Sequence, residues 1–395
     1  MFYAFCIILI TLPPLVYTLV RIHRLTRKQV TIYLTDFTDI RALLAPSTSL
    51  TTQLITHAIP NARFRQVFGI CSPFTTWHSH TVHTSLTTTT TALITQHGAP
   101  YPWPTFAAVA RYAIDAFLPY HVDRPPIAFD TFIQILTLRT ILIQLLGANP
   151  ADLVSEHDLA AVTHGIGVLW HISDTGSVML HLLSTITGHL HRWLPMYENP
   201  IELVTPAYEA IWRVVAIAVA YANRDPAARQ AFEAFMTLPD APHFRTRVGV
   251  EDLSVEMFIL EVLRLHPPTR YITLIVRVDD SPFPFPIPGL SRDVTVVADI
   301  EAVQRDADIW GDTANGFDST RFHPDLLTPS QEQSMFAFGR GRLSCVARNW
   351  APHAAAVLAG AVLERIGPES EFRLIQGSHL GHSGGWFGWK VCEAV

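Results

Sequence analysis

A cysteine that lies between two glycines and an alanine-rich segment restricts the possible folds of this chain more than any other feature. Cys345 stands in FAFGRGRLSCVARNW, and Gly339 and Gly341 precede it. Glycine permits positive φ and lets a flat ligand approach the backbone, because it has no Cβ. A cysteine at a helix N-terminus has a lowered pKa, which favours the thiolate that a metal requires. The segment predicts a thiolate on a glycine loop, for which an iron porphyrin is one suitable cofactor. A small buried cysteine beside an ordinary turn remains the alternative.

The segment EVLRLHPP places two opposite charges on an otherwise apolar helix. Glu261 and Arg264 are three residues apart and share one helix face, so they can pair. Their apolar neighbours favour burial, and a buried ion pair needs further hydrogen-bond partners. Arg321, in a loop-rich region downstream, is the candidate third group. A solvated surface pair is the alternative. The helix is expected to end at Pro267, because proline disfavours helix in the residue before it.

The rest of the pattern predicts a mainly helical chain with a smaller β portion, an α+β fold. Residues 101–238 have apolar residues at three- and four-residue spacing, which is typical of packed helices. Residues 271–299 resemble short strands interrupted by prolines. A loop-rich stretch over 304–340 is followed by a helix over 346–366. Residues 31–98 mix β-branched and turn-forming residues and include a threonine-rich run to which we assign no chemistry.

The N-terminus predicts a membrane anchor. The first twenty residues carry no charge, and that is the length of one bilayer crossing. Four basic residues follow: Arg21, Arg24, Arg27 and Lys28. No small-residue cleavage site is evident, so we predict an uncleaved anchor over residues 1–29, with residues 30–395 as one domain on the cytosolic side. A buried N-terminal helix is the alternative, since Pro13 and Pro14 would kink a spanning helix.

Composition excludes several classes of protein. The net charge is −6 and the basic residues are scattered, so nucleic acid is not an expected partner. The four cysteines lie far apart without C-x-x-C spacing, which argues against a disulfide scaffold and favours a reducing compartment. The 19 histidines show no second ligand pair at zinc-site spacing, so no histidine metal site is predicted.

Taken in order, E-x-x-R with its proline pair, RDADIWGDTANGFDSTRF, and F-G-x-G-x-x-x-C before a helix resemble the C-terminal half of the cytochrome P450 enzymes. The resemblance is clear over residues 200–365 and implies one large haem domain with the cytochrome P450 fold. It implies that Cys345 is the axial ligand of the iron in haem b. It also assigns five residues to cofactor binding, namely Phe338, Gly339, Gly341, Arg342 and Arg270, the two arginines as propionate candidates. The structural ion-pair network of the family is similar here to Glu261, Arg264 and Arg321.

Residues 202–232 resemble the long distal helix of the same family. Its A/G-G-x-D/E-T signature would place Glu209 as the catalytic acid and Ala210 where a threonine is expected. An ordinary surface carboxylate is the alternative for Glu209. The sequence P-A-Y-E-x-x-W-R is similar to that of fungal members of the family, so a fungal source is expected.

Three departures from the family pattern concern the cysteine loop, the distal helix and the length of the chain. Leu343 stands where an arginine normally approaches a haem propionate, and Ala210 removes a hydroxyl from the proton-delivery chain. Ala347 replaces a glycine and is still small. Without the anchor the chain is short for the family, which is compatible with specialisation or with a defective gene model.

The resemblance implies a monooxygenase that oxidises a small apolar substrate, a polyketide or terpenoid of fungal secondary metabolism. Dioxygen, electrons from NADPH through a membrane-bound cytochrome P450 reductase, and an endoplasmic reticulum location are implied with it. Two alternatives remain open. One is a haem-thiolate enzyme that rearranges, cyclises or dehydrates its substrate, and the other is a catalytically silent membrane-anchored relative.

Overall fold

The structure is a computed structural model that describes residues 30–95, 101–118, 125–173, 179–278, 292–380 and 385–394. The predicted anchor over residues 1–29 lies outside the described residues. Within the described part, one helix, Ile201–Ala222, is long and apolar enough to cross a membrane, and 78% of its most apolar window is buried inside the protein. Burial of that kind is expected of a core helix, so this helix is weak support for a membrane span.

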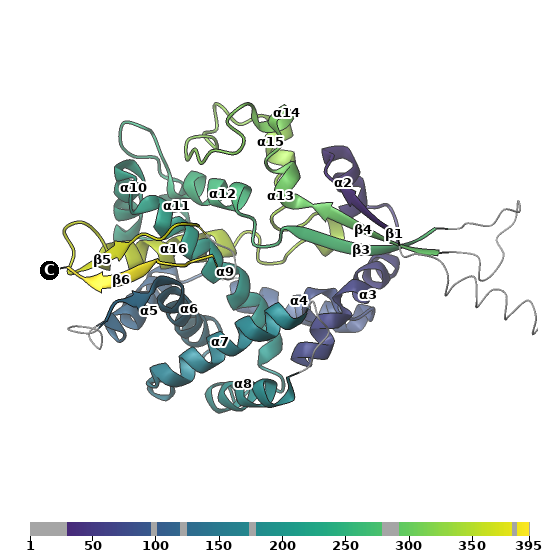
Figure 1. Ribbon diagram of the computed structural model, residues 1–395, viewed down its shortest axis with the longest axis horizontal. Coiled ribbons are helices and arrows are strands. Elements are labelled where there is room, and N and C mark those ends of the chain that lie inside the picture. Colours follow the sequence, from purple (N-terminus) through teal and green to yellow (C-terminus); the bar gives the residue numbers. More distant parts are fainter. Residues whose placement is uncertain are drawn as a thin grey trace, which may run out of the picture.

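Helices dominate the fold, as predicted (Figure 1). The helices are α2 (Phe37–Leu44), α3 (Leu50–Phe68), α4 (His80–Thr95), α5 (Trp103–Asp115), α6 (Phe129–Thr140), α7 (Glu156–Ile172), α8 (Leu180–Trp193), α9 (Ile201–Ala222), α10 (Pro226–Thr237), α11 (Ala241–Arg245), α12 (Val255–Leu265), α13 (Ile300–Val303), α14 (Ala307–Trp310), α15 (Pro329–Gln333) and α16 (Ala351–Arg365). The strands are β1 (Val30–Leu34), β2 (Ile127–Ala128), β3 (Tyr271–Val278), β4 (Arg292–Asp299), β5 (Phe372–Ile375) and β6 (Lys390–Glu393).

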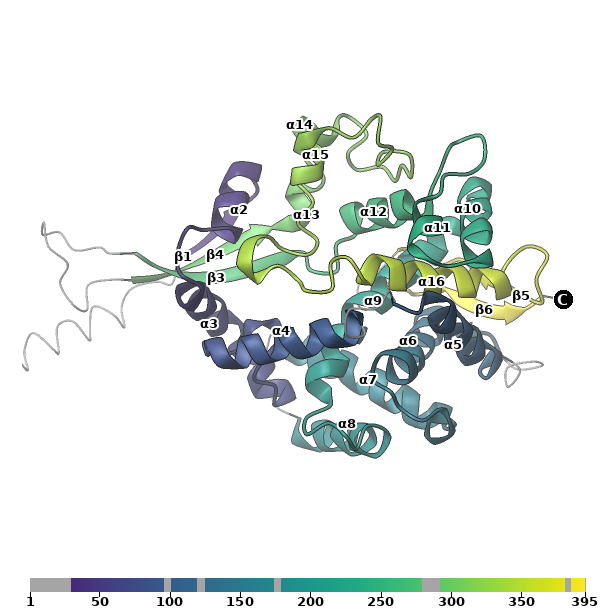
Figure 2. The same cartoon turned by 180° about the vertical axis from the view of Figure 1, so that it is seen from behind.

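Two small sheets lie toward opposite ends of the long axis, with most helices between them (Figures 1 and 2). The first has the order β1-β4-β3, in which β1 is parallel to β4 and β3 is antiparallel to it. The second has the order β2-β6-β5 and is antiparallel. The predicted strands over residues 271–299 are therefore confirmed as β3 and β4.

The centre of the helical part is formed by α16, which packs against α9, α5, α10 and α12. Its alanine-rich sequence fits that position, because small side chains let neighbouring helices approach closely. A Cβ at Gly360, for example, would lie 2.6 Å from Cγ of Met236 on α10. The helix that follows Cys345 in sequence is therefore fixed in the core on several sides.

The threonine-rich run is helical as part of α4, where hydroxyls such as that of Thr87 donate to backbone carbonyls one turn earlier. Two sequence expectations need correction. The expected long distal helix is two helices, because Asp225 caps the N-terminus of α10 and Pro226 begins it. The helix after Cys345 begins only at Ala351, with a proline in its first turn.

Candidate functional site

Cys345 lies in a loop that is closed by its own backbone. Its N–H donates to the carbonyl of Phe338 at 2.9 Å, and the N–H of Gly339 donates to the carbonyl of Phe336 at 2.8 Å. Gly339 and Gly341 have φ of 66° and 73°, in the left-handed region that glycine tolerates. The Cys345 side chain is exposed, so the loop presents a thiol to the outside of the packed core.

The same loop is pressed against α2. A Cβ at Gly341 would lie 2.9 Å from the carbonyl oxygen of Leu44 and 3.1 Å from Cα of Ala45, both of which are backbone atoms. A Cβ at Gly339 would meet nothing nearer than Cα of Ser344, at 3.9 Å. The two glycines therefore do different things. Gly341 allows the loop to dock on α2, whereas a Cβ at Gly339 would make only an ordinary contact within the loop.

Gly341→Ala is expected to destabilise the chain more than Gly339→Ala. Both variants incur the left-handed penalty of about 1–2 kcal/mol. Only Gly341→Ala also forces the loop away from α2, at a further cost of about 1–3 kcal/mol. Urea unfolding of the two variants measures the difference, and equal free energies of unfolding would contradict the tight contact with Leu44.

The environment of the Cys345 thiol differs from the sequence expectation. Although Cys345 keeps accessible surface, protein surrounds it on most sides, and this desolvation raises the pKa of its thiol. The backbone N–H of Ala347 partly opposes the rise by donating to the sulfur. The expected lowering by a helix dipole is wrong for the chain alone, because α16 starts at Ala351 and Cys345 is not at its N-terminus. A metal cation bound at the sulfur would instead lower the pKa of the Cys345 thiol, since a thiol that coordinates a metal is deprotonated.

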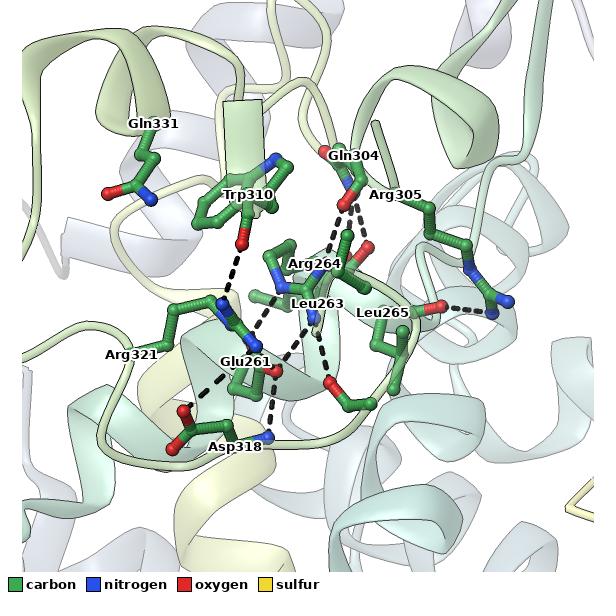
Figure 3. Close-up of polar contacts among 12 residues, drawn as sticks. Glu261, Leu263, Arg264, Leu265, Gln304, Arg305, Trp310, Asp318, Arg321 and Gln331 are labelled. Carbon is green, nitrogen blue, oxygen red and sulfur yellow. Dashed lines mark hydrogen bonds and ion pairs between the residues drawn. The ribbon is translucent and has the colours of Figure 1, made fainter. Parts of the chain in front are cut away.

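Glu261 and Arg264 form a fully buried ion pair on α12 (Figure 3). The guanidinium donates to both carboxylate oxygens, at 2.6 and 2.8 Å. It also donates to three backbone carbonyls, those of Gln304, Ala314 and Gly316, at 2.7 to 3.1 Å. Every partner that a buried guanidinium needs is thus supplied by the chain, which the E-x-x-R spacing alone does not reveal.

Arg321 completes this network. Its Nε lies 3.5 Å from Oε1 of Glu261, and its Nη1 donates to the carbonyl of Trp310 at 3.1 Å. The N–H of Asp318 donates to the same Glu261 oxygen at 3.0 Å. The structure therefore brings Glu261, Arg264 and Arg321 together and uses them to hold the loop between α14 and α15.

On α9, the two expected distal residues point in different directions. Four apolar residues at helical spacing are half-buried and form one open stripe: Leu203, Pro206, Ala207 and Ala210. Glu202, one turn before Pro206, is half-buried beside them and accepts from the N–H of Cys71 and the hydroxyl of Ser72. Glu209 is 3% exposed and lies off this stripe, since successive helix residues are turned by about 100°. Its carboxylate pairs with Arg213 at 2.5 Å and accepts from the indole N–H of Trp212 at 3.2 Å. Glu209 is therefore not the surface carboxylate of the alternative, and the predicted distal acid is held in a buried ion pair.

Comparisons with known proteins bear on this arrangement. A family model described as Cytochrome P450 matches residues 254–369. The crystal structure of P450BioI in complex with an acyl carrier protein ligated to hexadec-9Z-enoic acid superposes with a TM-score of 0.52 at 14% identity, covering 92% of this chain and 91% of that one. The fold is that of a cytochrome P450. Residues 254–369 carry the sequence of the same family, whose members are oxidoreductases that incorporate oxygen.

Relatives by sequence come from plants. Cytochrome P450 CYP749A22 of Panax ginseng is 33% identical over 113 residues, which are 28% of this chain and 21% of that protein. Cytochrome P450 72A11 of Arabidopsis thaliana is 32% identical over 120 residues, which are 30% of this chain and 23% of that protein. The 11-oxo-beta-amyrin 30-oxidase of Glycyrrhiza uralensis is 32% identical over 113 residues, 28% of this chain and 21% of that protein. The matched segment thus spans about a fifth of the length of these curated relatives.

The remaining predicted cofactor residues are placed less favourably for a cytochrome P450. Arg270 is ion-paired with Glu301 at 3.1 Å, and Glu301 also pairs with Arg305 at 2.9 Å. The Arg342 side chain is exposed. Leu343, at the position of the missing arginine, is half-buried in a short 3-10 turn. A propionate contact at Arg270 would have to compete with an existing carboxylate partner.

Sequence reasoning missed two polar residues of these clusters. Gln304 is fully buried, donates to the carbonyls of Leu263 and Arg264, and accepts from the N–H of Phe336, so it joins α12 to the segment before the cysteine loop. No local sequence signal indicates this role. Arg213 follows Glu209 by four residues, and that spacing could have indicated the pair.

Proposed function

We propose that the chain is a haem-thiolate monooxygenase that oxidises a small apolar substrate. The observation that carries the proposal is the exposed Cys345 thiol on a backbone-closed loop, in which a Cβ added at Gly339 would meet no atom nearer than 3.9 Å. A soft thiolate next to a surface without a Cβ fits a flat iron porphyrin. Cys345 would supply the thiolate that ligates the haem iron, with Phe338, Gly339 and Gly341 forming the surrounding loop. Haem b held in this way supplies dioxygen chemistry, in which the thiolate ligand favours cleavage of the O–O bond.

The protein's own side chains would exclude water and orient the substrate. The open stripe of α9 consists of Leu203, Pro206, Ala207 and Ala210, all of them apolar. Such a stripe binds an apolar substrate through its shape, and the neighbouring Glu202 carboxylate is already bound by the Cys71 N–H and the Ser72 hydroxyl. The name of the liquorice relative, an 11-oxo-beta-amyrin 30-oxidase, supports the terpenoid part of the predicted substrate class.

The finer predictions extend this proposal. The cytochrome P450 family takes electrons from a redox partner, and NADPH with a membrane-bound cytochrome P450 reductase is the partner proposed here. An anchor over residues 1–29, a catalytic domain over 30–395 and a location on the endoplasmic reticulum belong to the same proposal. The assignment to fungal secondary metabolism rests on the P-A-Y-E-x-x-W-R wording, and the plant relatives lend it no support.

A second candidate function is favoured by the open stripe itself. Ala210 has no hydroxyl, and Glu209 is held by Arg213 away from the stripe. A haem-thiolate enzyme that rearranges, cyclises or dehydrates its substrate would not need α9 to deliver protons to oxygen. A catalytically silent relative would differ from both candidates by failing to hold haem.

The test is the reduced, carbon monoxide difference spectrum of the expressed chain. We expect a Soret band at the thiolate position, lost in Cys345→Ser and retained in Cys71→Ser, which alters another exposed cysteine. Failure of the wild-type chain to bind haem would rule out both enzymatic candidates. If haem binds, turnover that requires NADPH and reductase supports monooxygenation, whereas turnover without reductant supports rearrangement.

A further inference from the structure

The carboxylate of Glu209 is bound by the next turn of its own helix. Nη2 of Arg213 lies 2.5 Å from Oε1 of Glu209, and the indole N–H of Trp212 donates to Oε2 at 3.2 Å. Arg213 also donates to the backbone carbonyl of Glu209. One guanidinium therefore holds both the side chain and the main chain of the acid, and the carboxylate is directed toward the C-terminal half of α9.

Arg213 is itself fixed by two aromatic rings. Its guanidinium carbon lies 4.7 Å from the ring centroid of Trp212 and 5.9 Å from that of Trp170 on α7. The Arg213 side chain is 9% exposed and that of Glu209 is 3% exposed, so water screens the pair weakly. Trp170 packs against Phe64 and Phe74, with ring centroids 4.9 and 5.5 Å away, so the position of the guanidinium is determined by tertiary packing.

We propose that Arg213 is a positioning residue for Glu209, which keeps the carboxylate ionised and turned away from the open stripe of α9. This role in catalysis rests on the proposed function: when the pair of Glu209 and Arg213 separates, α9 can supply a proton to the proposed haem-thiolate site. The pair itself is a property of the chain without haem.

Two opposing effects act on the Glu209 carboxyl group. Burial raises the pKa of Glu209, and the Arg213 guanidinium and the Trp212 indole limit that rise without cancelling it. A buried carboxylate that loses its cationic partner becomes neutral, because an unpaired buried charge is costly. Tyr208 on α9 interacts electrostatically with Glu209, with Arg213 and with Asp130 on α6. Tyr208 and Asp130 are both acids, so neither supplies a second cation that would keep Glu209 ionised.

Infrared spectroscopy of the chain without haem tests the proposal directly. A neutral carboxyl group absorbs at a higher frequency than the amide I band, where an ionised carboxylate does not absorb, and carboxyl labelling of glutamate shifts that band. At neutral pH we expect Glu209 to give no such band in the wild-type chain, identified by comparison with Glu209→Gln. Arg213→Met should show a neutral carboxyl band that disappears in the double variant with Glu209→Gln. Arg213→Lys, which keeps the charge, should resemble wild type.

A neutral Glu209 band in the wild-type chain would overturn the proposal even if no Arg213 variant folds. A folded Arg213→Met chain without the band would also overturn it. In the haem-loaded protein, Arg213→Met is expected to shift the pH profile of product formation toward higher pH, whereas Arg213→Lys should leave it in place. Failure to bind haem would refute the proposed function and leave the infrared result unaffected.

Discussion

Replacing Arg264 by methionine is expected to lower the free energy of unfolding by about 3–5 kcal/mol, because it leaves the Glu261 carboxylate buried and unpaired. The same change removes the donor of three backbone carbonyls in the segments from Gln304 to Gly316. A matched control is Arg365→Met, which breaks a bidentate pair with Asp115 that is about half exposed. Exposed pairs contribute about 0–1 kcal/mol, so the control should change little. Urea unfolding of both variants measures the two effects.

The double variant Glu261→Leu/Arg264→Met separates the cost of the unpaired buried carboxylate from the cost of the three carbonyls that lose their donor. It removes the buried charge, so part of the stability should return relative to Arg264→Met. The carbonyls of Gln304, Ala314 and Gly316 still lack their donor, so recovery should be incomplete. A single variant that unfolds like Arg365→Met would show that the buried network does not stabilise the fold.

In this network the ion pair was predictable from the sequence, but its backbone partners were not. The pairing of Glu261 with Arg264 follows from a three-residue spacing on an apolar helix, and the structure places the pair there. The partners from Gln304 to Gly316 are backbone carbonyls, which every residue carries, so no residue type marks them in advance. Gln304 was missed for the same reason, since its role depends on α12 lying beside α13 and the cysteine loop.

For α9, the sequence predicted the helix but not the surroundings of its side chains. The sequence placed Glu209 and Ala210 on one helix, and α9 confirms the helix. Which face of α9 stays open depends on the helices that cover it, and those contacts leave Ala210 half-buried while Glu209 turns toward Arg213. A pattern in one helix predicts the spacing of side chains, but their surroundings come from neighbouring elements. The parallel pairing of β1 with β4 was unpredictable for a similar reason, since it joins segments far apart in the chain.

Lowering the pH from about 7 to about 5 is expected to destabilise the chain through His353, a buried histidine of α16. Its ring stacks on Trp103 at 3.8 Å and on Phe244 at 4.7 Å, and Nε2 lies 3.3 Å from the carbonyl of Pro239. Burial lowers the pKa of His353 to about 4. In the unfolded chain the pKa is about 6.5, so between these values the unfolded state binds a proton that the folded state excludes. Stability therefore falls as the pH drops through this window, by about 2 kcal/mol at pH 5.

His353→Phe keeps a ring between Trp103 and Phe244 but cannot titrate, so its free energy of unfolding should depend less on pH than that of wild type by about that amount. At about pH 8 the two chains should differ by roughly 1 kcal/mol, which corresponds to the lost hydrogen bond to Pro239. His57 has a pKa lowered to about 4 by the same cause, so His57→Leu should remove a second, separate contribution in the same window. Urea unfolding at both pH values measures each contribution. If the free energies of unfolding of wild type and His353→Phe depended on pH in the same way, the aromatic stack would have to open to water before the chain unfolds. In that case α16 would be held less firmly beside the cysteine loop than its packing implies.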